Sequence, residues 1–187
     1  MTYRRMAEQA TDLACTKLGI DRACKTAATP LPGSESVIAK NSEPHSYTSF
    51  VQEGRHGTLT KEIPHQTIED KAMVCECEEV SVGEIKYAVN KMNTDNLANL
   101  RRHTRMGMGT CQSELCACRA ANVLCKVAKL EVQKSEQDLT DFISERWKGM
   151  FPVAWGETLK EGQLMSQIYE GLCGLNQITP LKKEDQQ

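Results

Sequence analysis

The sequence has no apolar run of the roughly 18 residues that a membrane-spanning helix needs, so direct membrane insertion is not expected. Basic residues near the N-terminus are not followed by an apolar stretch, which argues against a secretory signal and predicts a cytoplasmic location. Aromatic residues make up only 5% of the chain, which indicates a modest core. The formal net charge of -2 provides no dominant basic surface, so nucleic acid is not an expected partner.

The sequence also lacks the motifs of several enzyme classes. No G-x-G-x-x-G occurs, so the turn that seats a dinucleotide pyrophosphate at a helix N-terminus is missing. The histidines show no metal-binding spacing such as His-x3-His, and no nucleophile–base arrangement indicates a hydrolase or a transferase. We therefore expect no catalytic site within this sequence.

Cysteine, by contrast, is abundant. The chain has 9 cysteines, an odd number, and most of them lie between Cys75 and Cys118. A secreted disulfide scaffold would be smaller and would carry an export signal. In a reducing compartment, clustered thiols indicate metal ligands before they indicate disulfides.

Composition divides the chain into four parts. A 3.6-residue apolar period ending at Gly19 predicts an amphipathic helix at the N-terminus. A segment rich in proline, serine and threonine follows, without a sustained period, and its His45, His56 and His65 are expected to face solvent. The four parts are 1–28, the N-terminal helix; 29–72, a flexible linker; 73–130, the cysteine-bearing domain; and 131–187, a helical C-terminal extension.

Periodicity within 73–130 predicts an all-α domain. Apolar residues on one face predict a helix over 82–92, with Ser81 and Glu84 as a capping box at its start. A second helix is expected before the glycine-containing segment 106–109, and a third after Cys116. No segment alternates as a strand would. The cysteines are therefore expected on loops between helices.

Four cysteines form two closely spaced pairs. They are Cys75-x-Cys77 and, after a gap of 33 residues, Cys111-x4-Cys116. Four thiolates complete tetrahedral coordination at both irons of a [2Fe-2S] cluster. A structural zinc ion also takes four thiolates, although its usual pairs are Cys-x2-Cys to Cys-x4-Cys. The spacing alone favours iron–sulfur and leaves zinc, or no metal, open.

Residues near these pairs refine the prediction. Gly107 and Gly109 would let backbone amides approach the sulfur atoms closely. Cys118 is the rival of Cys116 as fourth ligand, because it also follows Cys111 closely. Arg105, beside the glycines, is the strongest candidate for a cation that offsets the negative charge of a cluster and raises its reduction potential.

The cysteine-bearing residues carry a resemblance. V-C-E-C-E-E-V at 74–80 and T-R-M-G-M-G-T-C-Q at 104–112, followed by Cys116, resemble the bacterioferritin-associated-ferredoxin type of [2Fe-2S] domain. The resemblance extends to T-Y-R at 2–4 through L-G at 18–19, E-R-W-K-G at 145–149, A-W-G at 154–156 and G-L-C-G-L at 171–175. In this order, the blocks are similar to the C-terminal third of the A subunit in the bacterial anaerobic glycerol-3-phosphate dehydrogenase family.

The resemblance implies a small all-α [2Fe-2S] domain with Cys75, Cys77, Cys111 and Cys116 as ligands. It implies that FAD belongs to a preceding dehydrogenase domain and is not expected here, with Thr2, Tyr3 and Arg4 as that domain's last remnant.

The resemblance also implies two partners: a flavin dehydrogenase domain or subunit, and an iron–sulfur, quinone-linked subunit that is membrane-associated. The chain would then relay electrons from the flavin to that second partner, peripheral to the inner membrane. The alternatives are a structural zinc module that docks an enzyme, and a truncated fragment without function.

Overall fold

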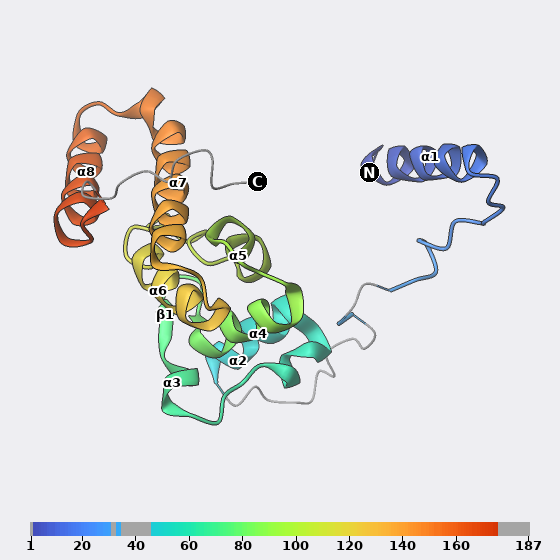
Figure 1. The fold of residues 1–187 in the computed structure, drawn as a ribbon, viewed down its shortest axis with the longest axis horizontal. Helices are drawn as coiled ribbons and strands as arrows, with labels where there is room; N and C mark the ends of the chain where they lie inside the picture. The colour runs from blue at the N-terminus through green and yellow to red at the C-terminus, as the bar shows by residue number, and fades with distance from the viewer. Residues whose placement is uncertain (1, 31–32, 35–45, 176–187) are drawn as a thin grey trace.

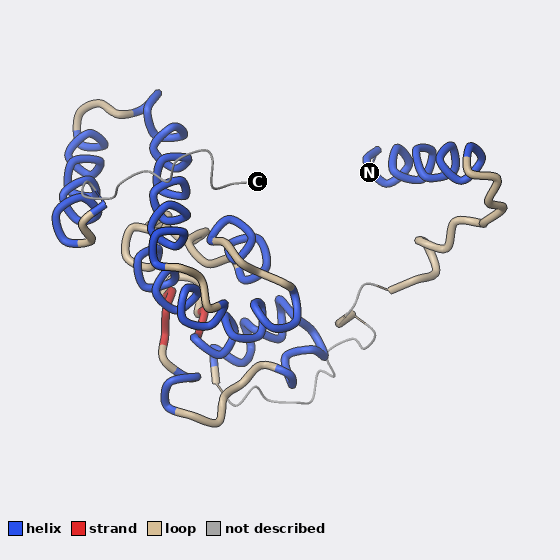
Figure 2. The backbone as a smooth tube through the Cα atoms, viewed as in Figure 1, coloured by secondary structure: helices blue, strands red, loops and turns tan. Residues whose placement is uncertain are grey.

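The computed structural model describes residues 2–30, 33–34 and 46–175, and helices dominate it (Figures 1 and 2). The first helix, α1 (Thr2–Lys17), ends close to Gly19, whose φ of 68° lies in the left-handed region. None of its residues is buried, and Figure 1 shows it apart from the other helices. The predicted helix is therefore present, but its apolar residues, such as Met6 and Leu13, remain exposed.

Residues 46–72 fold, which corrects the expectation of a linker for this part of 29–72. They form α2 (Tyr47–His56), the 3-10 helix η1 (Gly57–Glu62) and α3 (Ile68–Lys71). Ser46 caps α2 by accepting a hydrogen bond from the Ser49 amide. His56 is buried, contrary to expectation, whereas His65 is exposed and His45 lies outside the described residues.

A capping box begins α3, and one of its two side chains also contacts the next helix. Thr67 Oγ1 accepts from the Asp70 amide at 3.0 Å, and Asp70 Oδ2 accepts from the Thr67 amide at 3.1 Å. The other Asp70 oxygen accepts from Lys86 Nζ at 2.7 Å. Lys86 and Thr67 together lower the pKa of Asp70 to about 2.

We expect Asp70→Asn to destabilise the apo-chain near neutral pH and to have little effect in strong acid. Because the pKa of Asp70 is lowered from 3.8 to about 2, its stabilising contribution is complete above pH 3.8. That contribution is lost as the pH falls through about 2. Denaturant unfolding followed by circular dichroism, at several pH values, measures the difference from the wild type. A difference that stayed constant down to the lowest pH would contradict this role.

A short antiparallel hairpin precedes the predicted helices, which corrects the expectation of no strand. Strand β1 (Met73–Cys75) pairs with β2 (Val80–Ser81), with Cys75 opposite Val80. Strands of three and two residues are too short to show an alternating pattern in the sequence. The hairpin nevertheless determines where its turn, 76–79, presents Cys77.

The three helices predicted for 73–130 are confirmed. They are α4 (Val82–Met92), α5 (Leu97–Thr104) and α6 (Ala117–Ala128). Their apolar faces meet in one core, in which Ile85, Leu100 and Leu124 are almost completely buried. The Ser81 hydroxyl accepts from the Glu84 amide as expected, at 3.2 Å. The Glu84 carboxylate, however, turns to α2 instead of completing the capping box.

The C-terminal extension packs on this core. It comprises α7 (Val132–Met150), η2 (Phe151–Val153), α8 (Glu157–Ser166) and the π-helical η3 (Gln167–Leu172). Leu139 and Ile143 of α7 are buried against α5 and α6, and Met165 and Tyr169 complete the same core. The extension is therefore part of the cysteine-bearing fold.

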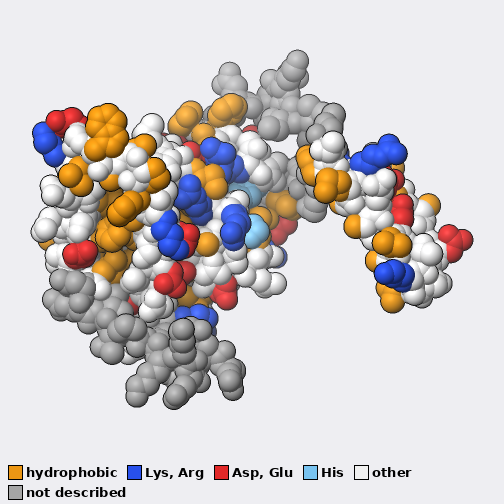
Figure 3. Space-filling view, turned by 90° about the horizontal axis from the view of Figure 1, so that it is seen from above, with side chains coloured by type: hydrophobic (Ala, Val, Ile, Leu, Met, Phe, Trp, Pro, Cys, Tyr) orange, Lys and Arg blue, Asp and Glu red, His pale blue; other side chains and the backbone are white. Residues whose placement is uncertain are grey.

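One face of the extension stays apolar and exposed. Figure 3 shows hydrophobic side chains gathered over the C-terminal helices, and Phe151, Trp155 and Leu172 are among the exposed ones. Trp147, in contrast, packs on the core. Within the described ranges, no helix is both long and apolar enough to cross a membrane.

Candidate metal centre

The structure brings the two cysteine motifs together. Cys75 ends β1 and Cys77 lies in the hairpin turn, while Cys111 lies in the loop after α5 and Cys116 is the N-cap of α6. The Sγ atoms of Cys77 and Cys111 are 3.7 Å apart, and the thiols of Cys75 and Cys116 are hydrogen-bonded. Each pair therefore takes one thiol from each motif.

Two thiol pairs fit a two-iron cluster better than a single ion. Four thiolates at about 2.3 Å from one zinc ion would all lie about 3.8 Å from one another. In the described part of the chain, no three Cys, His, Asp or Glu side chains converge in this way. In a [2Fe-2S] cluster, each iron takes two thiolates, so two pairs are what its ligands require.

Backbone amides surround the inner sulfur. The amides of Gly107, Glu78 and Cys77 all donate to Cys75 Sγ. A Cβ atom at Gly109 would lie 2.2 Å from Cys77 Cβ, and one at Gly107, where φ is 73°, would lie 2.0 Å from Ser113 Oγ. The loop therefore needs both glycines for the close approach that the sequence predicted. Amide donors of this kind stabilise negative charge on sulfur.

The inner pair is strongly polarised. The Cys116 thiol is the largest cause that lowers the pKa of Cys75 to about 6, and the backbone amides lower it further, although burial opposes the shift. The pKa of Cys116 is raised by its hydrogen bond with Cys75 and by burial. The thiolate is the form that binds metals, and these contacts favour that form at Cys75.

The two pairs differ in exposure. Cys75 and Cys116 are each only 1% exposed, whereas Cys77 is exposed and Cys111 is half-buried. Thr110, next to Cys111 in the loop, is also exposed. The site therefore reaches the surface on the side of Cys77 and Cys111.

Cys118, the rival ligand, is hydrogen-bonded to a cysteine outside the two motifs. Burial and a hydrogen bond to Cys173 raise the pKa of Cys118 to about 11. Cys173 belongs to the C-terminal extension, so Cys118 lies where α6 contacts that extension. The Cys125 thiol donates to the Leu130 carbonyl at 3.4 Å, so it too has a partner other than the cysteines of the two motifs. On these contacts we propose Cys116 as the fourth ligand.

Ion pairs flank the turn that carries Cys77. Arg105 Nε lies 2.9 Å from Glu78 Oε2, and both terminal nitrogens of Arg119 lie 2.7 Å from the Glu76 carboxylate. Arg105 is therefore next to the site, as predicted, but a carboxylate already balances its charge.

Sequence reasoning missed the residue that holds this turn from α2. Arg55 donates to the carbonyls of Glu78 and Glu79 at 2.8 and 3.2 Å, and to Glu84 Oε2 at 2.7 Å. Glu84, fully buried, also contacts His56 Nε2 at 2.8 Å. No periodicity in the segment that contains Arg55 signalled this contact.

Two further residues hold the second ligand loop from the C-terminal extension. Arg146 Nη1 donates to the Cys111 carbonyl at 3.1 Å. The hydroxyl of Tyr169 lies 2.8 Å from each of the carbonyls of Ser113 and Glu114, to which it donates. Burial lowers the pKa of Arg146, but a guanidinium remains charged at physiological pH. The E-R-W-K-G block contained Arg146 but did not indicate its role.

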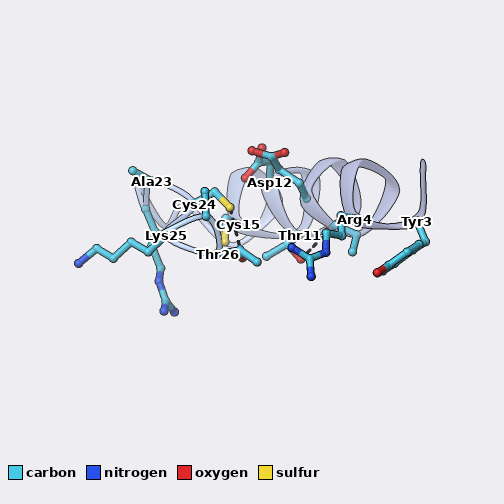
Figure 4. Close-up of a pocket in the computed structure, with 13 residues that line it drawn as sticks. Tyr3, Arg4, Thr11, Asp12, Cys15, Ala23, Cys24, Lys25 and Thr26 are labelled. Carbon is cyan, nitrogen blue, oxygen red and sulfur yellow. Dashed lines mark hydrogen bonds between the residues drawn. The ribbon is translucent and has the colours of Figure 1, made fainter. Parts of the chain in front are cut away.

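A groove elsewhere in the chain contains none of these four cysteines. It lies along α1, where 22–27 line it together with residues of the helix, including Tyr3 and Cys15 (Figure 4). Cys24 also lines it and donates to Thr26 Oγ1 at 3.5 Å.

The chain matches one domain family and, along nearly its whole length, several curated proteins. Residues 73–125 match the family model of the BFD-like [2Fe-2S] binding domain. The whole chain is 44% identical to the A subunit of the anaerobic glycerol-3-phosphate dehydrogenase of Haemophilus influenzae, of which it covers 34%. The corresponding protein of Escherichia coli K12 is 44% identical over 94% of the chain, which covers 33% of it. The A1 subunit of the Haloferax volcanii enzyme is 35% identical over 90% of the chain, which covers 29% of it.

The chain thus spans about a third of the length of the curated relatives that it matches most strongly. No solved structure matches it. The domain match indicates a [2Fe-2S] cluster as the cofactor of 73–125. Along its whole length, the chain is similar to the C-terminal third of the A subunit of anaerobic glycerol-3-phosphate dehydrogenase, and it contains a BFD-like [2Fe-2S] binding domain.

Proposed function

We propose that this chain is an electron-transfer module in which Cys75, Cys77, Cys111 and Cys116 hold the [2Fe-2S] cluster. The observation that carries the proposal is the pairing of thiols across the two motifs, at 3.7 Å for Cys77 and Cys111, within the matched domain. When bound, such a cluster accepts and releases one electron at a time. The chain's own residues supply the ligands, the amide donors and the access to the surface.

The unequal burial of the two thiol pairs supports a relay. The inner pair, Cys75 and Cys116, is shielded from water, which protects the ligands and strengthens the amide contacts. The outer pair, Cys77 and Cys111, lies at the surface, where a donor or acceptor can approach. This side is our proposed site of electron exchange.

The relatives suggest the partners. Their names describe subunits of an anaerobic glycerol-3-phosphate dehydrogenase, and this chain corresponds to about a third of them. We therefore propose that the donor is a flavin dehydrogenase domain or subunit, and that the acceptor is an iron–sulfur, quinone-linked subunit. That acceptor would keep the complex peripheral to the inner membrane. Glycerol 3-phosphate would be oxidised at the flavin and not by the residues of this chain.

Metal analysis of the full chain tests the proposal. We expect anaerobic purification, or reconstitution with iron and sulfide, to yield two irons and two acid-labile sulfides per chain. The protein should be red-brown and should bleach partly when dithionite supplies an electron. A colourless protein that holds one zinc ion would support the structural docking module instead. Less than one iron per chain after careful reconstitution would refute the cluster.

A further inference from the structure

A cation from outside the matched domain lies against the second ligand loop. Arg146, on α7, donates from Nη1 to the carbonyl of Cys111 at 3.1 Å. Its side chain is half-buried, and its Nε atom is buried without a hydrogen-bond partner among the described residues. The guanidinium is therefore held close to a proposed ligand and is partly shielded from water.

Arg146 differs from the other arginines at the site in its charge balance. Arg55 and Arg105 are paired with Glu84 and Glu78 at 2.7 and 2.9 Å, and Arg119 is paired with Glu76. Among the described residues, no carboxylate lies within ion-pair distance of Arg146. Glu114 acts on it only at longer range. Its positive charge is therefore not balanced by an ion pair, unlike the charges of Arg55, Arg105 and Arg119.

We infer that Arg146 raises the reduction potential of the cluster held at Cys111. This inference rests on the proposed function. Adding one electron makes the cluster and its four thiolates more negative, so a nearby positive charge stabilises the reduced form more than the oxidised form. Partial burial preserves this effect, because salt and water screen a buried charge less than an exposed one. Arg146 therefore positions the loop of Cys111 and acts on the cluster through its charge, without being a ligand.

The same loop offers a neutral comparison. Tyr169 holds it through hydrogen bonds to the Ser113 and Glu114 carbonyls and carries no charge. Tyr169→Phe therefore loosens the loop without changing the local charge. Arg102 is exposed on α5 and donates to Asn99, so removing its charge should leave the reduction potential unchanged.

The test is an EPR-monitored dithionite titration of the reconstituted full chain, which measures the midpoint potential. We expect Arg146→Gln to lower the ratio of reduced to oxidised cluster roughly tenfold at a fixed potential, which is about 59 mV for one electron. Arg146→Lys keeps the charge and should retain most of the wild-type value. Tyr169→Phe and Arg102→Gln should stay close to the wild type.

A second variant covers the case in which Arg146→Gln fails to hold a cluster. Arg146→Met replaces the guanidinium by an unbranched apolar side chain that suits this half-buried position, and it should shift the potential in the same negative direction. An unchanged potential in both Arg146→Gln and Arg146→Met would overturn the inference, as would an equal shift in Tyr169→Phe. Both outcomes would leave the proposed function standing, whereas a wild-type chain without iron would refute the two together.

Discussion

Cys116→Ala is expected to abolish the visible absorption of the reconstituted protein and to reduce its bound iron to a background level. Cys118→Ala should leave both unchanged. Cys116 is buried beside Cys75, and each iron needs two thiolates, so removing one inner thiol leaves an iron incompletely ligated. Cys118 contacts Cys173 instead. Iron and sulfide analysis with absorption spectra measures the difference.

The two cysteine variants are a matched pair on α6 and its N-cap, two positions apart. Circular dichroism of the apo-forms checks that both fold, since each substitution removes one sulfur from a packed position. The opposite result, with iron lost only in Cys118→Ala, would assign the fourth ligand to Cys118. Loss of iron in both variants would indicate that the packing of α6 decides cluster binding.

Glu84→Ala is expected to destabilise the apo-chain by roughly 3–5 kcal/mol, the range for breaking a buried ion pair by removing one partner. Glu84 is fully buried and lies 2.7 Å from Arg55 Nη2 and 2.8 Å from His56 Nε2. Its removal would leave the buried guanidinium of Arg55 without a counter-charge. Denaturant unfolding followed by circular dichroism measures the free energy of unfolding.

Glu69→Gln is the control for Glu84. Glu69 pairs with Lys126 at 3.1 Å and with Lys86 at 3.8 Å, but its side chain is largely exposed, so its loss should cost less than about 1 kcal/mol. Similar effects of the two substitutions would show that the Glu84 network does not hold α2 in place. Because Arg55 also binds the turn that carries Cys77, we expect Glu84→Ala to weaken iron retention as well.

The apolar periodicity of the sequence was sufficient to predict the helices around the cysteines. Val82, Ile85 and Val89 recur at helical spacing, and α4 has the predicted limits of 82 and 92. The cysteine spacing and the two glycines likewise indicated which loops meet. These features are local, because a helix face and a close backbone approach depend on residues near one another in the chain.

The segment before the domain was not predictable in the same way. Residues 46–72 have no sustained apolar period, and α2 is held largely through the contact of Arg55 and His56 with Glu84, about thirty positions further on. Glu84 itself fitted a local capping box, and only the folded chain shows that its carboxylate is used elsewhere. Contacts between distant residues leave no periodic signal.

The sequence by itself determined the helical cysteine domain, the four candidate ligands and the need for glycine beside them. Tertiary structure alone decided which thiols pair, because pairing depends on how the hairpin turn and the loop before α6 meet. It also places Cys116 beside Cys75 and Cys118 beside Cys173, a difference that the sequence spacing does not show. Finally, it placed Arg55 and Arg146, which lie outside the matched domain, against the ligand loops. These contacts join residues distant in the sequence, so they form only when the core packs.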